Sequence, residues 1–261
     1  MTGLSDSFQR PINYLRISVT DRCNLRCIYC MPAEGVRLVP HRDILTYEEI
    51  YTVAKAAAEL GINKVRITGG EPLVRLELPE LVRMLAQIDA IDDISLTTNG
   101  TLLSQYAAEL KAAGLHRVNI SLDTLRGDRF KAITRSNKSI DDVLRGIDIA
   151  KSVGLNPVKL NMVVVSGVND DEVLDFAART IDGEWHVRFI EFMPVVSGDN
   201  EAPHFVSVSE IKKRLEQLGG LEPCLPSVGN GPAKYFRFSG AKGTIGFITP
   251  VSEHFCFKCN R

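Results

Sequence analysis

Three cysteines close to the N-terminus are the residues of this sequence best suited to chemistry. Cys23, Cys27 and Cys30 have the spacing C-x3-C-x2-C and directly follow a β-branched segment that ends at Thr20. Three thiolates on one short loop can each bind one iron of a 4Fe-4S cube and leave the fourth iron without a protein ligand. Such an open iron favours a reactive cluster, whereas structural sites are usually closed by four ligands. A zinc ion completed by a remote histidine or cysteine is the alternative that the spacing leaves open.

Two other short motifs carry candidate chemistry. Cys256 and Cys259 form a C-x2-C pair near the C-terminus, while Cys224 stands alone and is expected to be a partly buried free thiol. The sequence GGEP, residues 69–72, closes the second predicted strand. Its two glycines allow backbone groups to approach a ligand closely at the end of that strand.

Composition excludes several classes of partner. Lys plus Arg, 31 residues, nearly balances Asp plus Glu, 32 residues, so no broad cationic surface is available for nucleic acid or an anionic membrane. The N-terminal residues lack the apolar core of a signal peptide, and no apolar run approaches the roughly 20 residues of a membrane span. We therefore expect a cytoplasmic protein without nucleic-acid or membrane partners, in which the spacing of the six cysteines indicates metal binding or catalysis rather than disulfides.

Between Tyr14 and Met193, β-branched runs alternate with amphipathic stretches. This alternation predicts six βα units on a parallel sheet, and these units position the motifs. The predicted strands begin at Tyr14, Asn63, Asp93, Arg117, Val158 and His186, and helices begin near Thr46, Leu78, Ser104, Ile140 and Asp170. Six units are too few for a closed eight-stranded barrel, so we predict an α/β fold, an incomplete (βα)6 TIM-like barrel, over residues 1–193. A small α+β module, with one helix and one hairpin, is predicted over residues 194–261.

Local signals mark the ends of several elements. Thr46 with Glu49 and Ser207 with Glu210 have the S/T-x-x-E spacing of a helix-capping box. Gly61, Gly114 and Gly154 each follow a predicted helix, where a left-handed residue commonly ends the helix.

The motifs together carry a family resemblance. The C-x3-C-x2-C spacing with Tyr29 before the last cysteine, followed one βα unit later by GGEP, resembles the signature of the radical S-adenosylmethionine (SAM) superfamily. Within it, the chain resembles the GTP 3′,8-cyclase family of molybdenum cofactor biosynthesis over essentially its whole length. The matching segments are LRISVTDRCNLRCIYCMP, KVRITGGEPLVR, LTTNG, RVNISLDTL, GLNPVKLNMVVV, VRFIEFMP and FCFKCNR.

The resemblance implies a role for particular residues. The first 4Fe-4S cluster is expected on Cys23, Cys27 and Cys30, and a second on Cys256 and Cys259. The residues expected to contact SAM are Tyr29, Gly70, Ser121 and Met193, and those expected to contact GTP are Arg16, Arg66, Thr97, Lys159 and Arg261. Four of the five GTP positions are cationic, as a triphosphate requires. Lys64 and Arg188 are weaker candidates for phosphate binding.

Strand cations support this assignment independently. Arg16, Arg66 and Lys159 stand among apolar neighbours, so they are expected to point into a barrel lumen or against helices. An anionic ligand would compensate such charges, which are expensive to bury. No side chain is nominated as an acid, base or nucleophile, because the radical chemistry belongs to the cofactors.

The family mechanism implied for this chain begins with SAM on the open iron of the first cluster. One electron cleaves the sulfonium to give a 5′-deoxyadenosyl radical, which takes the hydrogen from C3′ of GTP. The C3′ radical attacks C8 of guanine, and reduction gives 3′,8-cyclo-7,8-dihydro-GTP, while the second cluster holds the guanine base. The implied partners are an electron donor, a cyclic pyranopterin monophosphate synthase that receives the product, and a second copy of the chain in a homodimer.

The sequence departs from the family pattern at its end. The family's second cluster uses a third cysteine roughly a dozen residues after the C-x2-C pair, whereas this sequence ends at Arg261, the first residue of an Arg-x-Arg-x-Arg run. We interpret the chain as C-terminally truncated, with an incomplete second cluster as the alternative. Two other hypotheses compete with the cyclase: a radical SAM peptide maturase with auxiliary clusters, and a non-enzymatic zinc-binding protein.

Overall fold

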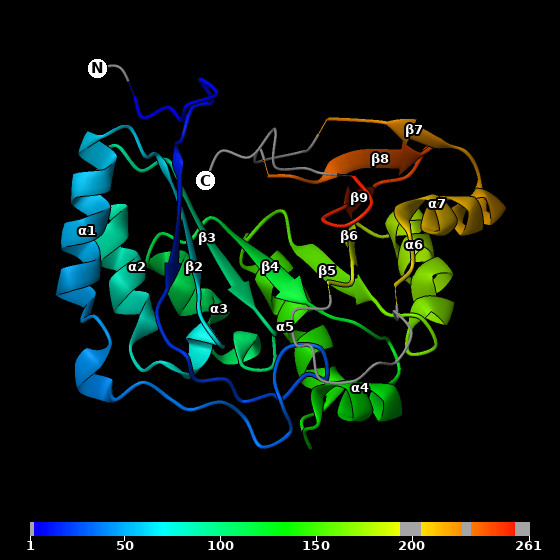
Figure 1. Ribbon diagram of the computed structural model, residues 1–261, viewed down its shortest axis with the longest axis horizontal. Coiled ribbons are helices and arrows are strands. Elements are labelled where there is room, and N and C mark those ends of the chain that lie inside the picture. Colours follow the sequence, from blue (N-terminus) through cyan, green and yellow to red (C-terminus); the bar gives the residue numbers. More distant parts are fainter. Residues whose placement is uncertain (1–2, 194–204, 226–230, 254–261) are drawn as a thin grey trace.

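The computed structural model describes residues 3–193, 205–225 and 231–253 (Figure 1). Six strands pair in parallel and in chain order. They are β1 Tyr14–Ser18, β2 Lys64–Thr68, β3 Asp93–Thr98, β4 Arg117–Ser121, β5 Lys159–Val164 and β6 His186–Glu191. The helices between and after them are α1 Tyr47–Glu59, α2 Leu78–Ala86, α3 Leu103–Ala112, α4 Gly127–Thr134, α5 Ile140–Ser152 and α6 Val173–Asp182.

The second part of the chain extends the same sheet. It contributes α7 Val208–Leu215, β7 Leu221–Pro223, β8 Lys234–Phe238 and β9 Thr244–Ile248. The predicted hairpin is confirmed as β8 and β9, which pair antiparallel, but β9 also pairs in parallel with β6. The strand order is therefore β1-β2-β3-β4-β5-β6-β9-β8-β7, and the sheet is not closed. An incomplete α/β barrel is confirmed, with β9 as a seventh parallel strand.

Short 3-10 helices complete the described chain. They are η1 His41–Asp43, η2 Pro72–Val74, η3 Asp170–Glu172 and η4 Glu216–Leu218. The predicted caps are confirmed: Thr46 forms a capping box with Glu49, and the Ser207 hydroxyl accepts from the Glu210 N–H at 3.2 Å. Gly61 adopts the left-handed conformation predicted for a helix end, with φ of 101°. In the described residues, no helix is long and apolar enough to cross a membrane.

The two faces of the barrel sheet differ sharply in polarity. Alternate residues such as Val65, Ile94 and Val118 are fully buried in the apolar core, which they share with the helices that cover that face (Figure 1). Residues on the opposite face meet one another in register: Arg66 is beside Ser95, and Asn119 is beside Lys159. Because side chains alternate between faces, the strands that build the core also place a row of polar groups in the lumen.

Candidate active site

The cysteine loop follows β1 and places three thiols around a common space. Cys23 and Cys27 are partly buried and Cys30 is exposed. Burial, together with charge repulsion from Asp123, Cys23 and Cys30, raises the pKa of Cys27 to about 12. Burial likewise raises the pKa of Cys23. The loop alone therefore favours neutral thiols, and a bound cation would have to release their protons.

This donor set fits an iron–sulfur cube better than a single ion. In the ranges that the structure describes, no group of three His, Cys, Asp or Glu side chains is placed to hold one metal ion. A cube takes one thiolate on each of three irons, so its ligands stand further apart than those of a single ion. Three soft sulfur donors on one loop, near enough for Cys30 to raise the pKa of Cys23 and of Cys27, suit such a cluster.

The GGEP turn packs directly on the cysteine loop. A Cβ on Gly70 would lie 2.3 Å from the carbonyl oxygen of Arg22, and one on Gly69 would lie 2.6 Å from that of Thr20. The Gly70 N–H donates to the Thr20 carbonyl at 2.6 Å, and the Glu71 N–H donates to the Arg22 carbonyl at 2.7 Å. Both glycines are therefore required for contact between two loops, and the expected contact of Gly70 with SAM stays a prediction.

Glu71, which the sequence analysis did not single out, connects this turn to the end of β3. Its buried carboxylate accepts from the Thr98 hydroxyl at 2.7 Å, the Asn99 N–H at 2.6 Å and the Leu73 N–H at 3.1 Å. Burial raises the pKa of Glu71, and the three donors oppose that shift. Asn99 in turn donates to Asn24 in the cysteine loop at 2.7 Å. GGEP, TTNG and the cysteine loop thus form one hydrogen-bonded unit.

The residues expected to contact SAM lie at this same edge. Tyr29 and Ser121 line a small cavity together with Cys27, and its volume of about 20 Å³ suffices for one water molecule. Gly70 is on the adjoining turn, and Met193 is exposed two residues beyond the end of β6. The carboxyl ends of parallel strands share one edge, so all four residues lie there.

The cations expected to contact GTP occupy the lumen face. In the sheet register, Arg16 is beside Arg66, and Arg66 is beside Ser95 on β3. Thr97 is two positions after Ser95 on the same strand and therefore lies on the same face. Thr97 is beside Asn119, which is beside Lys159. The structure therefore brings Arg16, Arg66, Thr97 and Lys159 onto one face. Arg261, Cys256 and Cys259 lie outside the described residues.

Lys159 is the most perturbed of these groups. It is 4% exposed, and its ammonium lies 5.4 Å from the centre of the Tyr235 ring. Burial, together with the charges of Arg188, Arg117 and Arg66, lowers its pKa to about 7. The lumen therefore holds several positive charges close enough to repel one another.

Two of those arginines received little or no weight in the sequence analysis. Arg188 is buried, donates to the side-chain oxygen of Asn119 and has a buried Nε without a hydrogen-bond partner among the described residues. Burial lowers its pKa. Arg117 is buried as well but forms an ion pair with Asp93 at the start of β3. Polar residues at alternate positions in apolar strands were the signal that could have identified both.

Glu191 connects the end of β6 with the C-terminal part of the chain. Its buried carboxylate accepts from the N–H groups of Val208 at 3.1 Å, Val251 at 3.1 Å and Ser252 at 3.0 Å. The Ser252 hydroxyl also donates to it. The start of α7 and the turn after β9 are thereby fixed at the edge that carries the cysteine loop.

Comparison with known proteins agrees with this architecture. Residues 17–179 match the family model of the radical SAM superfamily, and residues 185–261 match that of Molybdenum Cofactor Synthesis C. A solved structure described as native anSMEcpe with bound AdoMet and Kp18Cys peptide superposes with a TM-score of 0.59 at 20% identity, covering 78% of this chain and 58% of that one. Methylornithine synthase gives 0.59 at 19% identity, covering 79% and 62%. Fold and cysteine loop together define a radical SAM enzyme.

Curated relatives identify the family within that class. The GTP 3′,8-cyclase of Pelotomaculum thermopropionicum is 55% identical over 260 residues, 99% of this chain and 80% of the relative. That of Moorella thermoacetica is 54% identical over 258 residues, again 99% and 80%. The chain belongs to the GTP 3′,8-cyclase family of radical SAM enzymes. Membership implies SAM and a 4Fe-4S cluster as cofactors.

Proposed function

We propose that this chain converts GTP to (8S)-3′,8-cyclo-7,8-dihydro-GTP, a step of molybdenum cofactor biosynthesis. The observation that carries the proposal is the row of cations on the lumen face, in which the buried Arg188 and the partly buried Arg66 repel the charge of the buried Lys159. An anion of high charge would relieve that repulsion, and a triphosphate offers several oxygens to such groups. The cations lie on the strands whose carboxyl ends carry the cysteine loop, so a nucleotide bound there is within reach of SAM.

Cys23, Cys27 and Cys30 would hold the 4Fe-4S cluster, which when bound and reduced would supply the electron for cleavage of SAM. The chain's own residues bind and orient. Arg16, Arg66 and Lys159 are proposed to bind the triphosphate, with Thr97 as a neutral hydrogen-bonding group beside them. Tyr29, Gly70, Ser121 and Met193 are proposed to contact SAM.

A second cluster is proposed on Cys256 and Cys259, and Arg261 is proposed to contact GTP. The contacts of Glu191 support this assignment, because they hold Val251 and Ser252, a few residues before the cysteine pair, at the active-site edge. An electron donor and a synthase that consumes the cyclic product are the proposed partners. A homodimer and a cytoplasmic location are proposed as well.

Anaerobic reconstitution with iron and sulfide tests the proposal. The reconstituted chain is incubated with SAM, dithionite and each nucleoside triphosphate in turn, and 5′-deoxyadenosine is measured by chromatography. We expect its formation to be stimulated by GTP alone and to be accompanied by the cyclised nucleotide. Equal formation with every nucleotide would favour the peptide-maturase alternative. Zinc without sulfide after anaerobic purification would exclude the radical mechanism.

A further inference from the structure

Each cysteine of the loop has a neighbour that is hydrogen-bonded to the barrel. Asn24 follows Cys23, Arg26 and Ile28 flank Cys27, and Tyr29 precedes Cys30. The bonds join Asn24 to Asn99 at 2.7 Å, Arg26 to Thr134 at 2.8 Å, Ile28 to Ile133 at 3.0 Å and Tyr29 to Asp123 at 2.5 Å. Only the last of these four has a carboxylate as its acceptor, and short bonds to carboxylates are the strong ones.

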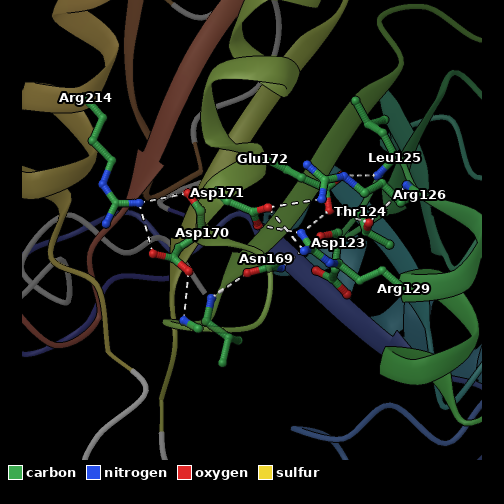
Figure 2. Close-up of polar contacts among 12 residues, drawn as sticks. Asp123, Thr124, Leu125, Arg126, Arg129, Asn169, Asp170, Asp171, Glu172 and Arg214 are labelled. Atoms are coloured by element: carbon green, nitrogen blue, oxygen red, sulfur yellow. Dashed lines mark hydrogen bonds and ion pairs between the residues drawn. The ribbon is translucent and has the colours of Figure 1, made fainter.

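Asp123 is itself fixed through both carboxylate oxygens and its backbone carbonyl. One carboxylate oxygen accepts from the Tyr29 hydroxyl, and the other accepts from the Val163 N–H on β5 at 2.8 Å. Its backbone carbonyl accepts from the side-chain amide of Asn169 at 2.8 Å (Figure 2). Asn169 is buried and also donates to the Val163 carbonyl at 2.9 Å. The carboxylate therefore has little freedom to follow a displaced loop.

The segment after Asp123 is fixed by a second buried acid. Glu172 is fully buried and accepts from the Thr124 hydroxyl and the Leu125 N–H, both at 2.6 Å (Figure 2). Arg129 on α4 donates to it at 2.6 Å and neutralises its charge. The connection from β4 to α4 is thus joined to the connection from β5 to α6 by charged bonds, which makes it a rigid support.

We propose that Asp123 is a positioning residue, which fixes the Tyr29 ring and through it Cys30, so that the cluster faces SAM at the carboxyl end of β4. The inference rests on the cluster assignment of the proposed function, but not on GTP as substrate. Ser121, expected to contact SAM, is two residues from Asp123 on the same chain segment. One rigid segment would therefore set the position of both the cofactor and its cluster, and reactions of this kind depend on placement to within about half an ångström.

Two isosteric variants of the full chain test the proposal, Tyr29→Phe and Asp123→Asn. Each variant changes one partner of the hydrogen bond between the Tyr29 hydroxyl and the Asp123 carboxylate. We expect SAM cleavage with dithionite to fall about 10- to 100-fold, the range found when groups that orient metal ligands are removed. We also expect the change that SAM causes in the electron paramagnetic resonance spectrum of the reduced cluster to be diminished or broadened. The double variant should be no worse than the poorer single variant, because both changes remove one interaction.

The matched control is Tyr47→Phe, which removes the hydroxyl of another tyrosine. Tyr47 lies on α1, and its hydroxyl donates to the Leu76 carbonyl at 2.7 Å. It should leave the spectrum and the SAM cleavage rate unchanged. Retention of the wild-type spectral change and of SAM cleavage within twofold in both test variants would overturn the proposal. A wild-type chain that assembles no cluster would instead overturn the proposed function.

Hydrogen exchange of the metal-free chains decides the case in which a variant assembles no cluster. The N–H groups of Cys30 and Met31 donate to the Cys27 carbonyl at 2.9 and 3.2 Å. Both should exchange faster in Tyr29→Phe and Asp123→Asn, while the N–H groups of Arg26 and Ile28 should keep the wild-type rate. Unchanged exchange at Cys30 and Met31 would show that the Asp123 bond does not fix the loop.

Discussion

The cysteine loop and the cationic lumen lie along the same strands but are organised on opposite principles. The loop is held by bonds within the chain, since Asn24, Tyr29 and the flanking amides all have partners on the barrel. The lumen instead concentrates cations, of which Arg117 is paired with Asp93, and burial and the neighbouring arginines lower the pKa of Lys159. The cysteine loop is therefore positioned before any cofactor binds, whereas the lumen would be stabilised by the binding of an anion.

The largest effect is expected from a substitution that removes a proposed cluster ligand and leaves the residues of the lumen unchanged. Cys27→Ser should abolish the first cluster and reduce SAM cleavage to the background rate, because a cube cannot be retained on two thiolates. Iron and sulfide analysis with the cleavage assay measures both. Cys224→Ser is the control, since Cys224 follows β7 and is not a proposed ligand. A Cys27→Ser chain with a full cluster would refute the ligand assignment.

A change in the lumen should have the complementary result. Lys159→Met should weaken GTP binding about 10- to 100-fold, because a hydrogen bond to a charged group contributes about 1.5–3 kcal/mol. Without GTP its melting temperature should rise, because one buried charge among like charges is gone. Anaerobic calorimetry and thermal melting measure these effects, with exposed Lys55→Met as the control. Unaltered GTP affinity would remove Lys159 from the site.

The pKa of Lys159, lowered to about 7, predicts the direction of the pH dependence. At pH 8 the ammonium is mostly deprotonated in the free protein, and a bound triphosphate favours its charged form. GTP binding should therefore take up close to one proton at pH 8, and affinity should fall by at most tenfold per pH unit above 7. Calorimetry in buffers of different ionisation enthalpy counts the proton, and Lys159→Met should take up none.

The same shift affects folding without GTP. A lysine whose folded pKa is depressed binds fewer protons in the folded than in the unfolded chain between about pH 7 and the ordinary value of 10.5. The contribution of this residue to the free energy of unfolding should therefore rise with pH through that window. Denaturant titrations of the wild type and of Lys159→Met, compared across this pH window, would isolate the contribution of Lys159 to the free energy of unfolding. A wild-type dependence no steeper than that of the variant would contradict the shift.

The smallest effect concerns how well the edge loops are supported. Glu71→Gln keeps the side-chain shape but replaces one carboxylate oxygen by an NH₂ group. That group is a donor facing groups that are themselves donors, the Thr98 hydroxyl and the Asn99 N–H. We expect the free energy of unfolding to fall by about 1–3 kcal/mol, the usual cost of an unsatisfied buried polar group. Denaturant titration measures it, with the exposed Glu80→Gln expected to remain within about 0.5 kcal/mol of wild type. Equal stabilities would mean that Glu71 does not join the loops.

Sequence patterns predicted local elements better than their long-range contacts. All six predicted barrel strands begin within one residue of the observed ones. Both the β-branched runs and the glycines that end the preceding helices are local signals. Helix α4 was missed because its eight residues include Gly127 and a β-branched pair at its end. The attachment of β9 to β6 was also missed, because a hairpin pattern does not indicate which strand it joins.

The same limit applies to the site. Cysteine spacing and the glycines of GGEP are visible in the chain itself, and so are the strand cations. Single acids such as Glu71, Asp123 and Glu191 look like ordinary turn or strand-end residues until their partners are known. Apart from Leu73, those partners lie 17 to 94 positions away along the chain, a separation over which local patterns carry no information.

The direction of β9 determines where the rest of the chain is delivered. Because β9 runs parallel to β6, the polypeptide leaves Ile248 beside the end of β6 rather than beside its start. An antiparallel arrangement of the same five residues would have released the chain about 17 Å away, at the opposite rim of the barrel. One reversal at the β8–β9 turn thus releases the chain at the rim of the barrel that carries the cysteine loop, without a long return connection.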